Sequence, residues 1–184
     1  MAAIVCLGIA VWDLVFAVPH LPPQPQKLTA SSLSRGGGGM AASAAAAAAR
    51  LGGTVAFWGR LGDDLEGQAL RAELQSYGVS VPAPIEAGTQ TPTAAVLVAE
   101  HGERLLAVFP GQLNDATAWL PLAQLAQVQA VWADFRWPAG ASALFTAARA
   151  RRLPSVLDAD QGDPDSVLAL LPQVEHAEIG RAHV

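Results

Sequence analysis

Short apolar runs alternate with helix-like segments along most of this chain, and this alternation constrains its fold more than any other feature. Residues 3–10, 54–61, 128–135 and 155–157 have the composition of buried strands. The spacing of apolar and small residues predicts helices over 40–51, 65–77, 139–152 and 165–171. Strands that alternate with helices of this length are typical of βαβ units, so we expect an α/β fold with a mainly parallel sheet.

Other extended segments interrupt this pattern. Residues 11–18 are predicted to be extended, and residues 93–108 alternate on both sides of His101-Gly102, as in a β-hairpin. Four prolines between positions 19 and 25 predict a loop, and the run from Gly36 to Gly39 predicts a glycine turn. Gly62-Asp63-Asp64 is predicted to be a turn that caps the next helix.

Composition narrows the class of protein. Hydrophobic residues make up 52% and charged residues 15%, which is typical of a buried sheet and not of a disordered chain. A net charge of -5 argues against nucleic acid as a partner. The single Cys6 excludes a disulfide framework, and no stretch reaches the ~18 apolar residues of a membrane helix. We therefore expect a soluble cytoplasmic protein that does not contact a membrane.

Ligands of parallel sheets bind beyond the carboxyl ends of the strands. Asp13, the glycine run, Arg136, Asp158 and Asp160 each follow a predicted strand, so we expect them to converge on one crevice. Glycines before a helix let the backbone approach a ligand closely. The glycine run lacks the Gly-Lys-Ser/Thr ending of a P-loop, and it follows a loop and not the first strand, which argues against a nicotinamide enzyme.

Several spaced motifs together resemble one family. They are Gly8 with Asp13, the pair Gly38-Gly39, the segment Gly59-Arg60-Leu61-Gly62-Asp63-Asp64, and Gly102-Glu103-Arg104. This set resembles the N-terminal half of the ribokinase-like (pfkB-type) sugar kinases, over residues 1–177. The resemblance implies a ribokinase-like three-layer sandwich with a small β lid, formed by segments of about 11–35 and 88–110, and it allows a homodimer through that lid.

The resemblance also implies a function, the phosphorylation of a sugar hydroxyl by ATP with Mg²⁺. It places Asp13 on the sugar hydroxyls, with Gly38 and Gly39 in the turn that contacts the sugar. Ser43 stands where the family often has an asparagine, and Val11 stands where it often has another. These two departures leave the identity of the sugar open.

Within the family, the chain is most similar to sulfofructose kinases, through Lys27 and the segments 132–137 and 156–160. By this resemblance Lys27 and Arg136 hold an anionic group of the sugar, and a guanidinium offers a planar fork for an anion. Val108 falls where a sulfonate-binding asparagine is expected, so phosphate or carboxylate remains open. The alternative for Arg136 is an ordinary salt bridge with Asp134 or Asp158.

In this family a Gly-Ala-Gly-Asp-like segment supplies the catalytic base and the anion hole, and this sequence contains no such segment. We therefore expect the chain to carry only the sugar side of the enzyme and to be inactive by itself. Residues 178–184 resemble a translated sequencing adapter and are expected to be an artefactual tail. The alternative is a natural sugar-binding module without catalysis, and the flanking DNA would distinguish the two.

Overall fold

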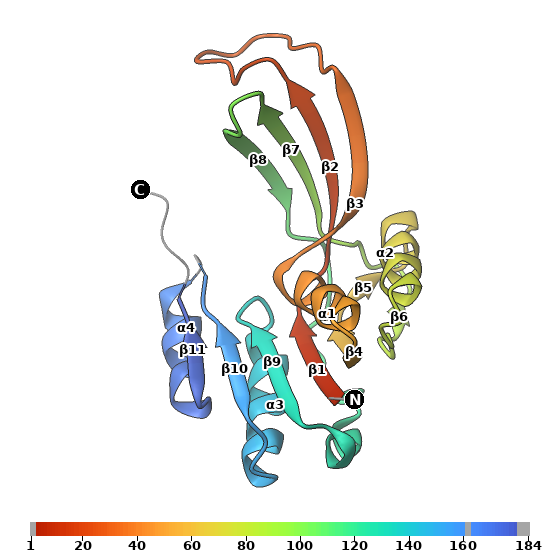
Figure 1. Cartoon of the computed structure of the whole chain (residues 1–184), viewed down its shortest axis with the longest axis vertical. Helices are drawn as coiled ribbons and strands as arrows, with labels where there is room; N and C mark the ends of the chain where they lie inside the picture. Colours follow the sequence, from red (N-terminus) through yellow and green to blue (C-terminus); the bar gives the residue numbers. More distant parts are fainter. Residues whose placement is uncertain (1–2, 161–162, 180–184) are drawn as a thin grey trace.

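The computed structural model describes residues 3–160 and 163–179, and its largest element is a five-stranded sheet (Figure 1). All neighbouring strands of this sheet are parallel, in the order β11-β10-β9-β1-β4. The strands are β1 (Ala3–Gly8), β4 (Thr54–Gly59), β9 (Ala130–Asp134), β10 (Ser155–Asp158) and β11 (His176–Glu178). The prediction of an α/β fold with a mainly parallel sheet is confirmed.

Helices pack on both faces of the parallel sheet, because side chains of a strand alternate between its faces. In β1, Cys6 belongs to the core that includes residues of α1 and α2, whereas Val5 and Leu7 belong to the core that includes α3. The helices are α1 (Met40–Arg50), α2 (Leu65–Ser76), α3 (Pro138–Ala150) and α4 (Pro164–Leu170), with 3₁₀ turns η1 (Leu122–Gln127) and η2 (Leu171–Gln173). Among the residues described, no helix is both long and apolar enough to span a membrane.

A second sheet of four strands extends from one end of the parallel sheet and forms the lid (Figure 1). Its strands lie in the order β3 (Ser32–Gly38), β2 (Val11–Val18), β7 (Thr93–Ala99) and β8 (Arg104–Phe109). The extended segment at 11–18 and the hairpin at 93–108 are thus both present. A small parallel pair, β5 (Leu61–Gly62) and β6 (Ile85–Glu86), lies beside α2.

The glycine run was predicted to be a turn, and this prediction is wrong for most of it. Gly36 to Gly38 form the end of β3, where Gly38 pairs with Val11 and Gly36 pairs with Asp13. Backbone pairing with β2 outweighs the weak strand preference of glycine. Only Gly39 turns the chain, with a φ of 90°, and α1 begins directly after it.

The edge strand β11 was not predicted, because His176-Ala177-Glu178 is short and has no apolar run; all three residues are exposed. Ala177 pairs with Leu157, and the carbonyl of Glu178 accepts a hydrogen bond from the N–H of Ala159 at 2.7 Å. The expected boundary between residues 177 and 178 therefore falls inside a strand. Residues 180–184 of the expected tail lie outside the described residues.

Candidate functional site

A cavity of about 500 Å³ lies where the carboxyl end of the parallel sheet meets the lid, within the range typical of small-molecule sites. The residues after β1, β9 and β10 contribute Ile9, Arg136 and Asp160 to its wall. The lid contributes Asp13 and an apolar surface that includes Ala94, Leu106 and Val108. The structure thus brings four predicted site residues together: Asp13, Gly39, Arg136 and Asp160.

Asp13 is the acidic side chain that the lid contributes to this cavity, and it lies near the start of β2. Its side chain is half-buried, and this burial raises the pKa of its carboxyl group. Gly38 of the neighbouring strand lies against it, since a Cβ atom on Gly38 would collide with Oδ2 of Asp13. Gly38 does not line the cavity itself but leaves the space that the Asp13 carboxylate occupies.

The backbone conformation at position 39 and the atoms around it both require a glycine. Its φ of 90° is rare for residues with a Cβ, and a Cβ here would lie 2.7 Å from the carbonyl oxygen of Ile9. Gly39 and Met40 border the cavity at the start of α1, where the helix dipole is positive. This helix end favours oxygen-rich or anionic ligand groups.

Two arginines border the cavity, and only one was identified from the sequence. Arg136 is exposed, and its guanidinium lies 4.7 Å from the centre of the Phe135 ring. Arg60 pairs with Asp115 at 2.6 Å, donates to the carbonyl of Arg136 at 3.3 Å, and lies 4.9 Å from the centre of the Trp137 ring. Arg60 belongs to the motif Gly59-Arg60-Leu61-Gly62-Asp63-Asp64, but it was not predicted to be a site residue.

Asp134 lies beneath the cavity and was considered only as an ion-pair partner of Arg136. Instead, its Oδ1 accepts a hydrogen bond from the backbone N–H of Arg136 at 2.9 Å. The side chain is fully buried, and this burial raises its pKa to about 6 even though backbone N–H groups donate to it. The signal in the sequence was a carboxylate at the end of an otherwise apolar strand.

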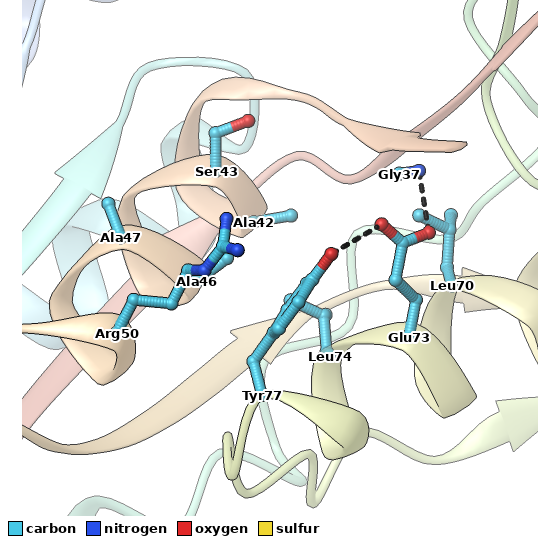
Figure 2. A pocket seen from close by; sticks show the side chains of 10 residues that line it. All are labelled: Gly37, Ala42, Ser43, Ala46, Ala47, Arg50, Leu70, Glu73, Leu74 and Tyr77. Atoms are coloured by element: carbon cyan, nitrogen blue, oxygen red, sulfur yellow. Dashed lines mark hydrogen bonds between the residues drawn. The ribbon is translucent and has the colours of Figure 1, made fainter. Parts of the chain in front are cut away.

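Two predicted site residues lie away from this cavity. Lys27 is exposed in the loop between β2 and β3. Figure 1 shows this loop at the end of the lid that is farthest from the parallel sheet. Ser43 borders a separate hollow of about 240 Å³ between α1 and α2 (Figure 2). In that hollow, Glu73 accepts hydrogen bonds from the N–H of Gly37 at 2.8 Å and from the hydroxyl of Tyr77 at 3.3 Å.

Asp158 is also separate from the main cavity, because it borders a hollow with Trp132 and Glu178 at the edge of the sheet. Burial raises its pKa, and the nearby charges of Asp160 and Glu178 raise it further. Within the described parts of the chain, no three side chains of the His, Cys, Asp or Glu type gather as metal ligands. The described residues therefore offer no dedicated protein cage for a metal ion, and we assign none of them to Mg²⁺.

Comparison with known proteins identifies a family whose model matches this chain. The model of the pfkB family of carbohydrate kinases matches residues 1–181. The crystal structure of a "putative ribokinase" from Agrobacterium tumefaciens is 29% identical with a TM-score of 0.89, and covers 97% of this chain. A ribokinase from Cryptococcus neoformans, solved in complex with ADP, is 25% identical with a TM-score of 0.77 and covers 96% of this chain.

An uncharacterized sugar kinase of Archaeoglobus fulgidus is 39% identical over 71 residues, which is 39% of this chain. The chain spans 59% and 55% of the Agrobacterium and Cryptococcus proteins in those structures, and the Archaeoglobus match spans 28% of that protein. The Agrobacterium and Cryptococcus structures therefore share their fold with nearly the whole of this chain.

Proposed function

Since this chain belongs to the pfkB family of carbohydrate kinases, we propose that it forms the sugar-binding part of an enzyme that transfers a phosphate from ATP to a sugar hydroxyl. The observation that carries this proposal is the position of Asp13 in the cavity between sheet and lid. An ionised carboxylate accepts hydrogen bonds from two hydroxyls of one sugar more strongly than a neutral acceptor does.

The surroundings of Asp13 support this role. Gly38 leaves room for the carboxylate, and Gly39 turns the chain so that the positive end of α1 borders the same cavity. The apolar lid surface that includes Leu106 and Val108 can cover the less polar face of a sugar ring. In this mechanism, the chain binds the sugar, orients the hydroxyl that reacts and shields it from water.

ATP and Mg²⁺ belong to the proposal through the family, and the ADP complex of the Cryptococcus ribokinase supports the choice of nucleotide. Mg²⁺ would neutralise charge on the transferred phosphate. Phosphoryl transfer also needs a base for the attacking hydroxyl. The family provides that base in a Gly-Ala-Gly-Asp-like segment that this sequence does not contain, so we assign proton transfer to no residue of this chain.

We further propose that the sugar carries an anionic group, which Arg136 binds. The protein has a net charge of -5, so an anionic substrate requires local cations. Arg136 and Arg60 both border the cavity, and Arg136 is the candidate because it follows β9 at the position where the family resemblance places an anion-binding side chain. Lys27 remains a prediction, because it lies in the loop between β2 and β3 and does not line the cavity.

The test is a calorimetric competition panel on the full-length protein with fructose, fructose 6-phosphate and sulfofructose. Arg136→Lys keeps the charge but loses the planar fork, so it should weaken binding of the anionic sugars and leave fructose unchanged. Arg151→Lys on the surface after α3 is the matched control. Equal affinity of the wild-type protein for all three sugars at low salt would exclude an anionic substrate without excluding a sugar kinase.

A homodimer through the lid is the proposed assembly. The face of the lid opposite the cavity exposes large apolar side chains, among them Leu33, Leu105 and Phe109. A second copy that covers this surface would remove it from water. Light scattering on wild-type protein and on Leu105→Glu tests the proposal, since the substitution should convert dimers to monomers; a wild-type monomer would exclude it.

A further inference from the structure

The carboxylate of Asp134 connects three segments of the backbone that are far apart in the sequence. Its Oδ2 accepts hydrogen bonds from the N–H of Ile9 at 2.8 Å and of Ala41 at 3.1 Å. Its Oδ1 accepts from the N–H of Arg136 at 2.9 Å. The side chain is completely buried, so its oxygens are satisfied from within the protein.

Each of these three segments forms part of the cavity wall. Ile9 lies between β1 and the strand that carries Asp13, and it borders the cavity itself. Ala41 lies in the first turn of α1, directly after the cavity residues Gly39 and Met40. Arg136 follows β9 and borders the cavity on a third side. The Asp134 carboxylate therefore holds three walls of the cavity from beneath.

The neighbouring backbone is shaped to admit this carboxylate. Gly8 has a φ of 148°, and a Cβ on Gly8 would collide with the carboxylate of Asp134. Burial of a carboxylate opposes its ionisation, so a charged group here is weak evidence for a purely stabilising role. The chain instead keeps an acceptor of three hydrogen bonds at the point where the walls of the cavity meet.

We propose that Asp134 is a positioning residue for the sugar site, which acts by fixing Ile9, Ala41 and Arg136 so that Asp13 and Arg136 face one cavity. The proposal rests on the proposed function only for the identity of the ligand, which is a sugar. The three hydrogen bonds of Asp134 exist without any ligand, so the geometry stands independently.

The variant that tests this is Asp134→Asn, which keeps the shape of the side chain but loses one acceptor. Val131→Ala is the control, because Val131 is buried in the same strand but does not border the cavity. Affinity of the full-length protein for fructose, fructose 6-phosphate and sulfofructose would be measured by calorimetry, together with stability in urea. Asp134→Asn should lower the affinity for the sugar that binds most tightly by about tenfold or more. Val131→Ala, at a similar loss of stability, should change the same affinity by less than about twofold.

Amide hydrogen exchange provides a second measurement that needs no sugar. In Asp134→Asn, exchange at Ile9, Ala41 and Arg136 should speed up together, and in Val131→Ala these three amides should remain protected. Asp134→Ser is the second variant if the asparagine variant does not fold. Wild-type protein that binds none of the sugars would contradict the proposed function, and the exchange data would then decide the positioning role alone. Unchanged affinity, or unchanged exchange at these amides, would overturn the role of Asp134.

Discussion

Gly38 lies directly against the carboxylate of Asp13, so closely that a Cβ on Gly38 would collide with an oxygen of that carboxylate. The two residues belong to neighbouring strands, β3 and β2, in which Gly38 pairs with Val11 and Asp13 pairs with Gly36. The glycine therefore determines where the acid of the candidate site can lie. The end of the glycine run thus sets the position of the carboxylate that lines the cavity.

Gly38→Ala should weaken sugar binding, because the new methyl group forces the Asp13 side chain out of its position. Gly36→Ala is the matched control, since a Cβ at Gly36 meets no atom within 4 Å. Calorimetry on the full-length protein should show a loss of about tenfold or more for Gly38→Ala, comparable to the loss of a hydrogen bond to a charged group. Equal affinities of the two variants would show that the contact does not matter for the ligand.

Asp64 should stabilise the fold by capping α2. Its Oδ1 accepts from the N–H of Gly67 at 2.8 Å, and its Oδ2 accepts from the N–H of Thr91 at 2.7 Å. Asp64→Ala should lower the free energy of unfolding by roughly 1–2 kcal/mol, whereas Asp63→Ala, at an exposed side chain, should change it by less than about 0.5 kcal/mol. Urea denaturation of both variants measures this, and equal effects would contradict the cap.

The pKa of Asp64 adds a pH dependence to the same comparison. Burial alone would raise this pKa, but hydrogen bonds from Thr91 and Gly67 bring it below its ordinary value. A lowered pKa means that the stabilisation is present above the pKa of the unfolded chain and is lost as pH falls through the folded value. The difference between wild type and Asp64→Ala should therefore shrink in acid.

Much of the fold followed from the sequence, because the apolar runs of β1, β4 and β9 and the small residues of α1 have strong local patterns. The end of β3 and strand β11 did not, because their pairing depends on neighbours that no local pattern reveals. The helix cap at Asp64 was predicted because its signal is local.

The site was less predictable than the fold. Asp13, Gly39 and Arg136 border one cavity, as predicted, because Asp13 lies five residues after β1, Gly39 follows β3 and Arg136 follows β9. Asp134 was missed as a site component because its role depends on the backbone N–H groups of Ile9 and Ala41, which are 125 and 93 residues away. The distant position of Lys27 depends on the length and path of the lid strands, which its sequence context does not specify.

Asp134 should make stability depend on pH in the opposite sense to Asp64. Burial raises its pKa from 3.8 to about 6, and the charge of Asp158 adds to this, while N–H donors oppose it. The Asp134 carboxyl therefore binds its proton more tightly in the folded protein than in the unfolded chain. The stabilisation that this proton gives is fully present below the pKa of the unfolded chain, and it is lost as pH rises through about 6. The difference in unfolding free energy between wild type and Asp134→Asn should fall by roughly 2 kcal/mol from pH 4 to 7. A difference that stays constant with pH would contradict this.

The 184-residue chain should show no kinase activity, since its sequence has no Gly-Ala-Gly-Asp-like segment to supply the base. Loss of a general base typically costs ~10²–10⁴-fold, and loss of the anion hole adds to this. A coupled assay for ADP release with fructose, fructose 6-phosphate and sulfofructose measures the activity, with the full-length protein as the positive control. Sugar-dependent turnover by the chain alone would show that another residue supplies the base.

The most direct test of the sugar site is the affinity of full-length Asp13→Ala for the same three sugars, measured by calorimetry beside its affinity for ATP. Glu103→Ala at the exposed tip of the lid hairpin is the control for the loss of one negative charge. Removal of the carboxylate should weaken the tightest sugar by ~1.5–3 kcal/mol and leave ATP binding unchanged, and the control should leave both unchanged. Wild-type affinity of Asp13→Ala for every sugar that the protein binds would contradict the assignment of this cavity as the sugar site.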